Sequence, residues 1–133
     1  MERVYTAPRL DKLGVKPGSR VALVGLDDDA FEAELRDRTA DITHGDPAPD
    51  TDLVFLAADD HEDLAALPAL RERLRPNGAI WVVSHKGKAA TLRDVEVIAA
   101  AIANDLVDNK VASWDETRTS ARLVIPVALR GGR

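Results

Sequence analysis

Apolar residues are arranged along the chain in short continuous runs that are separated by polar, helix-favouring segments. The run 52–58 is the clearest strand. The runs 19–26 and 79–84 also predict buried strands, because a run with no polar alternation is typical of a sheet covered on both faces. The full set of predicted strands is 19–26, 39–43, 52–58, 79–84, 109–114 and 121–127. The intervening segments 27–38, 59–78 and 92–107 predict helices.

Local signals define the helices further. Aspartates precede the first two helices, where a side-chain oxygen can accept from free amide groups. Pro68 interrupts the second segment and predicts a short helix to Leu67 followed by another that starts near Pro68. The third segment is predicted to be an amphipathic helix with its apolar face on the core. That face comprises Leu92, Val95, Ile98, Ala99, Ile102 and Leu106.

The order β-α-β-β-α-β-α-β-β predicts an α/β fold. Strands joined through helices are parallel, whereas the last two are joined only by residues 115–120 and must form an antiparallel hairpin. Pro126 places the last strand at an edge or ends it. We predict an open, mainly parallel sheet with helices on both faces. One domain is expected over residues 13–128, with an N-terminal arm at 1–12 and a flexible tail at 129–133.

Composition and charge narrow the classes of function. The formal net charge of −5 disfavours nucleic acid and anionic membranes as partners. The absence of cysteine excludes disulfides, thiol catalysis and cysteine-ligated zinc. The first residues lack the apolar core of a signal peptide, and no apolar run approaches the ~20 residues of a membrane span. We therefore expect a cytoplasmic protein.

Two stretches resemble class I methyltransferases. LGVKPGSRVALVG (13–25) is similar to the first strand of that family, and LPALRERLRPNGAIWVV (67–83) to its helix, turn and strand. The resemblance implies a reduced methyltransferase-like, Rossmann-like fold. The family places a GxGxG-type loop after the first strand, but here Gly25 is followed by Leu-Asp-Asp-Asp. The missing glycines argue against the family's activity.

A second resemblance is more extensive. KLGVKPGSRVAL (12–23) and LVDNKVASWDETRTSARLV (106–124) are similar to a family of small bacterial proteins catalogued as a domain of unknown function. The similarity covers roughly residues 10–125. It implies the same fold with no assigned activity, so it transfers no catalytic residues.

Candidate ligand-binding residues lie where open α/β sheets bind ligands, outside the carboxyl ends of the parallel strands. Four stretches qualify: 27–29, 59–61, 84–88 and 114–120. Each has a structural alternative, because acidic residues cap helices, lysines are solvated, and Asp115 can pair with Arg118 or Arg122. The selected candidates are Asp27, Asp28, His85, Lys86, Lys88, Trp114, Asp115 and Ser120. No catalytic residue or metal site is assigned, and Trp81 is predicted to belong to the core.

Three functional hypotheses follow. The preferred one is a non-catalytic, methyltransferase-like domain that acts as a protein-interaction or regulatory binding module and self-associates as a dimer. The alternative is a binder of a small anionic metabolite or nucleotide at the carboxyl edge, built from Asp27, His85, Lys86, Lys88 and the 114–120 hairpin. The third is an active S-adenosylmethionine-dependent methyltransferase. No cofactor is expected under the first hypothesis.

Overall fold

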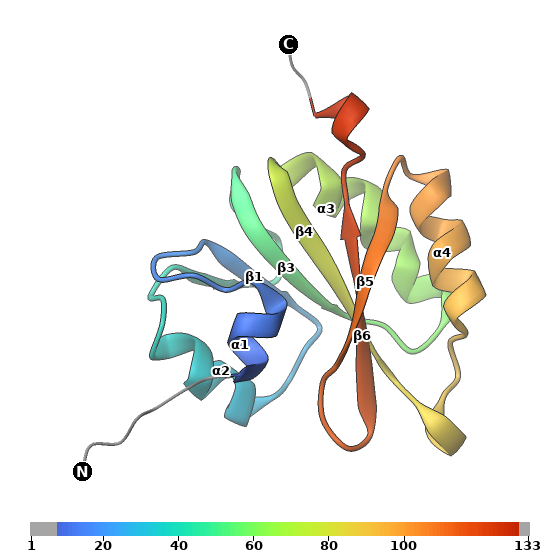
Figure 1. Ribbon diagram of the computed structural model, residues 1–133, viewed down its shortest axis with the longest axis horizontal. Coiled ribbons are helices and arrows are strands. Elements are labelled where there is room, and N and C mark those ends of the chain that lie inside the picture. Colours follow the sequence, from blue (N-terminus) through green and yellow to red (C-terminus); the bar gives the residue numbers. More distant parts are fainter. Residues whose placement is uncertain (1–7, 131–133) are drawn as a thin grey trace.

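A computed structural model describes residues 8–130, in which six strands form one sheet (Figure 1). The strands are β1 (Val21–Val24), β2 (Ile42–His44), β3 (Thr51–Ala57), β4 (Leu74–His85), β5 (Val107–Ser113) and β6 (Arg118–Val124), in the order β2-β1-β3-β4-β6-β5. The pairs β1–β2, β1–β3 and β3–β4 are parallel, and β4–β6 and β5–β6 are antiparallel. The predicted α/β sheet with a C-terminal antiparallel hairpin is confirmed.

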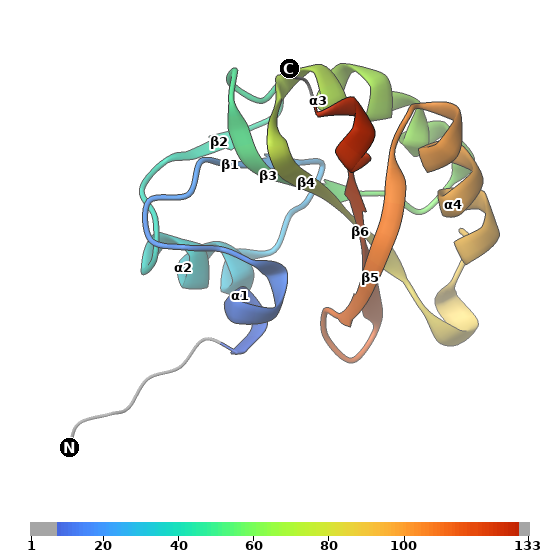
Figure 2. The same cartoon turned by 45° about the horizontal axis from the view of Figure 1, so that its top comes forward.

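Helices cover both faces of the sheet, as Figures 1 and 2 show. On one face lie α1 (Pro8–Leu13) and α2 (Asp29–Arg36), and on the other lie the 3-10 helix η1 (His61–Ala66), α3 (Leu67–Arg73) and α4 (Asp94–Ala103). Two short 3-10 helices, η2 (Gly87–Ala89) and η3 (Val127–Leu129), follow β4 and β6. Within residues 8–130, every helix is too short or too polar to cross a bilayer.

The strand alternation divides the core into two layers. Leu23, Phe55 and Trp81 point to the side of α1 and α2, whereas Val54 and Ile80 point to the side of α3 and α4. Both sets are buried, which confirms that these strands are covered on both faces. The buried aromatic side chains, Phe31, Phe55, Trp81 and Trp114, all lie in the first layer. The aromatic layer therefore lies beneath α1 and α2.

The segment predicted as an arm contains a helix that the sequence pattern did not indicate. Leu10 and Leu13 of α1 are each 1 % exposed, and the Nε1–H of Trp81 donates to the Leu13 carbonyl at 3.0 Å. Six residues are too few for a helical period to be recognised, so α1 is defined by its packing. The rest of the predicted arm, residues 1–7, and residues 131–133 of the predicted tail lie outside the described residues.

The structure tests three predicted boundaries, at Pro68, at Asn77-Gly78 and at Pro126. η1 ends at Ala66 and α3 carries Pro68 in its first turn, as the proline signal predicted. However, α3 ends at Arg73 and β4 begins directly, so the predicted helix end at Asn77-Gly78 is wrong. A Cβ on Gly78 would lie 2.8 Å from the carbonyl oxygen of Asp52, so the glycine permits close strand pairing. Pro126 follows β6, which lies between β4 and β5, so this proline ends an interior strand.

The orientation of α4 contradicts the prediction from its apolar period. Leu92 and Leu106 are buried, but Val95, Ile98 and Ile102 are 58 %, 36 % and 66 % exposed. Instead, Val97 and Ala101 face the sheet. Asp94 and Glu96 are the charged residues of the helix, so its apolar period does not distinguish the inner face from the outer one.

Candidate functional site

The carboxyl ends of β1 and β3 lie at the point where the strand order of the sheet reverses. The chain leaves β1 to form β2 on one side and returns to form β3 on the other. In open α/β folds, the crevice at such a point is the usual ligand site. Gly25 turns the chain after β1 with a φ of +68°, and Asp28 is the N-cap of α2. On the neighbouring strand, Ala58 and Asp59 follow β3.

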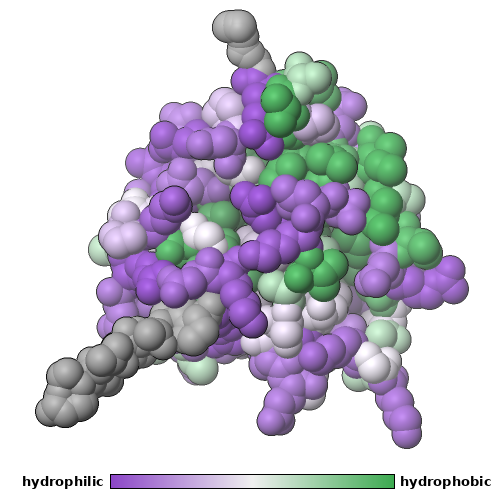
Figure 3. Space-filling view, in the orientation of Figure 1, coloured by the Kyte–Doolittle hydropathy of each residue, from purple (hydrophilic) through white to green (hydrophobic). Residues whose placement is uncertain are grey.

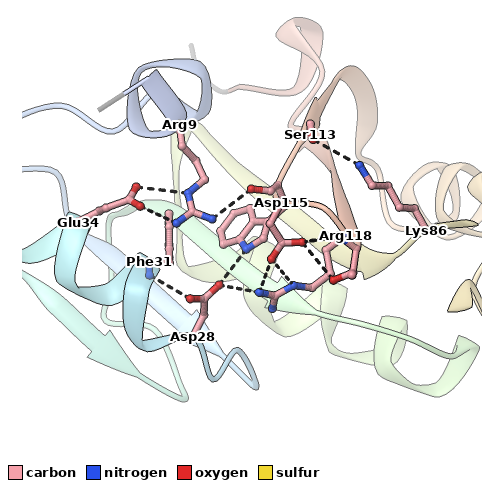
Figure 4. Close-up of polar contacts among 10 residues, drawn as sticks. Arg9, Asp28, Phe31, Glu34, Lys86, Ser113, Asp115 and Arg118 are labelled. Atoms are coloured by element: carbon pink, nitrogen blue, oxygen red, sulfur yellow. Dashed lines mark hydrogen bonds and ion pairs between the residues drawn. The ribbon is translucent and has the colours of Figure 1, made fainter. Parts of the chain in front are cut away.

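Asp28 is the centre of a hydrogen-bond network at this crevice (Figure 4). Its Oδ1 accepts from the Phe31 amide at 3.0 Å, which caps α2. Its Oδ2 accepts from Trp114 Nε1 at 3.1 Å and from Arg118 Nη2 at 2.7 Å. The Asp28 side chain is only 9 % exposed, so both oxygens are used within the protein. The β5–β6 hairpin is thereby tied to the start of α2.

Trp114 fills the apolar side of the same region. It is 3 % exposed, and its ring centroid lies 4.3 Å from that of Phe31 and 5.7 Å from that of Phe55. The Arg9 guanidinium lies over the Trp114 and Phe31 rings at 5.2 and 5.1 Å. Arg9 also donates to the Trp114 carbonyl at 3.1 Å and forms an ion pair with Glu34 at 2.6 Å. These contacts join α1, α2 and the hairpin around one indole ring.

Arg118 links the two carboxylates of the network. Its Nη2 lies 2.7 Å from Asp28 Oδ2 and 2.7 Å from Asp115 Oδ2. Burial opposes ionisation of Asp115, but hydrogen bonds from Arg118 and from the Thr117 amide hold the pKa of Asp115 down at about 2. The pKa of Asp28 is also lowered, because bonds from Phe31, Trp114 and Arg118 outweigh its burial.

Acid is expected to weaken the hairpin through Asp115. Its folded pKa of about 2 lies below the ordinary value of about 3.9, so its contribution is complete above about pH 4 and is lost as the pH falls towards 2. The carboxylate is 33 % exposed, so we expect only about 1 kcal/mol after solvent screening. Urea unfolding at pH 2.5 and 6 should show a smaller pH effect in Asp115→Asn than in wild type. The exposed neighbour Glu116 provides the control, because Glu116→Gln should keep the pH effect of wild type. An equal reduction of the pH effect in Glu116→Gln would contradict the assignment of that effect to Asp115.

A second cluster lies at the carboxyl end of β4. Asp59 Oδ1 accepts from the His85 amide at 3.0 Å and contacts His85 Nδ1 at 2.8 Å. These bonds lower the pKa of Asp59 although its burial acts in the opposite direction. Beside them is a hollow of about 380 Å³. Its lining includes Ser84, His85, Lys86, Arg93 and Asp94.

The structure therefore separates the sequence candidates into groups. Asp28, Trp114 and Asp115 belong to the hydrogen-bond network around Arg118, whereas His85 and Lys86 line the hollow beside β4. Asp27 and Lys88 are exposed. Ser120 is fully buried, and its hydroxyl donates to the Ala112 carbonyl at 2.8 Å.

The acidic stretch at 59–61 divides in the same way. Asp60 caps η1 by accepting from the Asp63 amide at 2.9 Å, as a capping aspartate would. Asp59 is held by His85, and His61 lines a separate groove beside α4. In the part of the chain that the structure describes, no three acidic or histidine side chains converge as a metal site would need.

Sequence reasoning identified the Asp115–Arg118 pair as one alternative, and the structure confirms it. It missed Arg9, whose guanidinium lies over the Trp114 ring, and Glu34, which forms an ion pair with Arg9. The only sequence signal for Arg118 was its spacing of three residues from Asp115 in a turn. No local pattern links Arg9 or Asp28 to Trp114, because these contacts span 105 and 86 residues.

Comparisons with known proteins support the fold. No protein-family model matches the chain, and no curated protein is found to be similar. Among solved structures, the chain is similar to a SAM-dependent methyltransferase from Aquifex aeolicus, with 16 % identity, a TM-score of 0.68 and 87 % of each chain covered. It also resembles a putative type 11 methyltransferase from Sulfolobus solfataricus, with 10 % identity and a TM-score of 0.66 over 93 % of this chain and 92 % of the other.

A third similar structure is a magnesium protoporphyrin IX methyltransferase from Synechocystis PCC 6803 with bound SAM. It shares 11 % identity and a TM-score of 0.64 over 86 % of this chain and 74 % of the other. At these identities the likeness defines the fold alone. The chain has the methyltransferase Rossmann-like fold that the first resemblance implied. Membership of the small bacterial family stays a prediction.

Proposed function

We propose that this protein is a non-catalytic binding module with a methyltransferase-like fold, acting through protein–protein contacts. The observation that carries the proposal is the network of Asp28, Trp114 and Arg118 at the crevice between β1 and β3. A ligand at this position would compete with the protein's own indole ring and ion pairs. The scaffold is thus retained while its usual ligand crevice is filled.

The chemistry of the first loop supports the same conclusion. A dinucleotide-type or adenosyl ligand needs glycines for close backbone approach and free polar groups to orient it. After Gly25 the loop carries three aspartates, and the most buried of them already accepts three hydrogen bonds. The start of a helix usually attracts anions such as phosphate. The negative charge of the aspartates at the start of α2 opposes a phosphate at this position.

The filled crevice would reduce affinity even for a ligand that could replace these contacts. Exposing a buried tryptophan and separating its partners costs on the order of 3 kcal/mol. A ligand that binds only the opened form then loses a factor of about 100 in apparent affinity. S-adenosylmethionine would therefore bind at best weakly.

Thermal unfolding in the presence of S-adenosylmethionine tests the proposal. Ligand at about 100 times its dissociation constant would add about 2.7 kcal/mol and raise Tm by several degrees. We expect a change of less than about 1 °C with millimolar S-adenosylmethionine or S-adenosylhomocysteine. Saturable binding by calorimetry, with a rise of several degrees, would overturn the proposal.

A second candidate function is favoured by the hollow beside β4. His85, Lys86 and Arg93 line a space of about 380 Å³, which is large enough for a small anionic metabolite. Asp94 shares the lining and adds one negative charge to it. A thermal-shift screen of dicarboxylates and nucleotides would support this function if a hit were lost in Lys86→Ala. If no such anion raised Tm, the hollow would be a solvated surface feature.

A further inference from the structure

The outer face of α4 is apolar although it faces solvent. Val95, Ile98, Ala99, Ile102 and Ala103 are all exposed, and together they form a stripe along the helix, here called the α4 stripe. Figure 3 shows hydrophobic surface gathered over α4 and the start of β5, with a further apolar cluster at η3. A surface helix normally presents charged side chains on this side, so the stripe is the surface of an unpartnered helix.

We propose that the α4 stripe binds the same stripe of a second copy of this chain, forming a two-fold dimer with antiparallel helices. The inference rests on the proposed function as an interaction module and names its partner. In a two-fold contact the same patch serves both copies, so the patch must complement itself. The spacing of the stripe satisfies this condition. An antiparallel pairing centred between Ile98 and Ala99 places Val95 opposite Ile102 of the partner copy and Ile98 opposite its Ala99.

The surface beside the stripe is shaped to receive such a partner. Two hollows, of about 400 and 390 Å³, lie between η1 and α4. Their linings share His61, Ala100 and Ala103. Alanines at these positions let a second helix approach closely, and the larger Ile102 side chain of the partner copy can enter the hollow.

Charge also favours the antiparallel arrangement. Arg93 precedes α4 and Asp105 follows it, and both residues are exposed. Neither side chain forms an ion pair with another residue in the range 8–130. The same two-fold axis brings Arg93 of one copy close to Asp105 of the other at each end of the helix pair. Antiparallel helices also align their dipoles favourably.

The exposed area is sufficient for a weak dimer. Val95, Ile98, Ile102, Val107, Val127 and Leu129 are between 36 % and 76 % exposed. Val95, Ile98 and Ile102 contribute on the order of 300 Å² of apolar surface in each copy, and the flanking residues of β5 and η3 bring the patch to on the order of 500 Å². A dimer that buries the stripe together with these flanks would remove about 1,000 Å² for the pair. This area is at the lower limit for a specific interface, so we expect a weak dimer that forms only at high protein concentration.

Pairing through the sheet edge is the competing mode, and the structure disfavours it. β5 is an edge strand, but its register shifts between Asp108 and Lys110. A bulge and an edge lysine are common means by which proteins prevent edge-to-edge pairing. The open backbone of β5 is therefore a poorer docking surface than α4.

Sedimentation of matched variants tests the proposal. Wild-type protein should approach twice its 14.4 kDa mass at concentrations of about 200 µM. Ile102→Glu should remain monomeric, whereas Val111→Glu, a similar change at 67 % exposure on β5, should dimerise like wild type. A monomeric wild type would overturn the dimer without affecting the result with S-adenosylmethionine. Loss of dimer in Val111→Glu but not in Ile102→Glu would overturn the α4 interface in favour of the edge.

Cross-linking tests the antiparallel register directly. The sequence has no cysteine, so Ala99→Cys introduces a single thiol close to the proposed axis. We expect a covalent dimer of Ala99→Cys with a short bismaleimide, and only monomer with Ala90→Cys, which is exposed away from the stripe. Equal cross-linking of both variants would contradict the proposed contact.

Discussion

Replacement of Trp114 with alanine is expected to lower the free energy of unfolding by about 3–5 kcal/mol. The indole is 3 % exposed, packs on Phe31 and Phe55, and lies beneath Arg9. Its removal leaves a cavity between α1, α2 and the hairpin, and Asp28 loses one hydrogen-bond donor. Urea unfolding followed by circular dichroism measures the change.

Trp114→Phe separates packing from hydrogen bonding. It keeps an aromatic ring against Phe31 but removes the Nε1–H, so we expect a loss of only about 1–2 kcal/mol. A loss below about 1 kcal/mol in Trp114→Ala would show that the indole does not hold the hairpin against α2. Trp114 would then not be the side chain that fills the apolar side of the crevice.

Replacement of Asp28 with alanine is expected to destabilise the protein by about 2–4 kcal/mol. The change removes the N-cap of α2, leaves the Trp114 Nε1–H without its acceptor, and takes one carboxylate from Arg118. Because the pKa of Asp28 is lowered in the folded state, wild type also loses this stabilisation as the pH falls through that folded pKa. In urea unfolding, the difference in stability between wild type and Asp28→Ala should therefore be larger at neutral pH than at acidic pH.

The neighbouring aspartates provide matched controls. Asp27 and Asp29 are exposed, and the structure gives neither side chain a hydrogen bond among residues 8–130. Asp27→Ala and Asp29→Ala should each change stability by no more than about 0.5 kcal/mol. If all three variants were equally destabilised, the negative charge at the start of α2 would explain the effect better than the hydrogen bonds of Asp28.

The architecture could be predicted from the sequence because its signals are local. These signals, such as the apolar runs, Pro68 and the short 115–120 connection, each involve only a few neighbouring residues. They correctly predicted the parallel strands that are joined through helices and the C-terminal antiparallel hairpin. The α4 face could not be predicted, because the helix is apolar on almost every side. There the burial of Val97 rather than Val95 depends on how the helix packs on the sheet.

The candidate site was predictable in part for the same reason. The position of Asp27–Asp29 after the first strand directed attention to the carboxyl end of the sheet, and the capping role of Asp28 follows from its place before α2. The contacts of Asp28 with Trp114 and Arg118 join segments 86 and 90 residues apart. A single sequence does not reveal such pairs, so the contacts of Asp28 with Trp114 and Arg118 could be found only in the folded structure.

A crystal structure determined in the presence of millimolar S-adenosylmethionine tests the central claim most directly. We predict that Trp114 Nε1 and Arg118 remain bonded to Asp28, with no adenosyl density between the carboxyl ends of β1 and β3. The same experiment on Trp114→Ala shows whether removal of the indole alone opens the crevice. Adenosyl density at this position in the wild-type protein, with Trp114 displaced, would contradict the account.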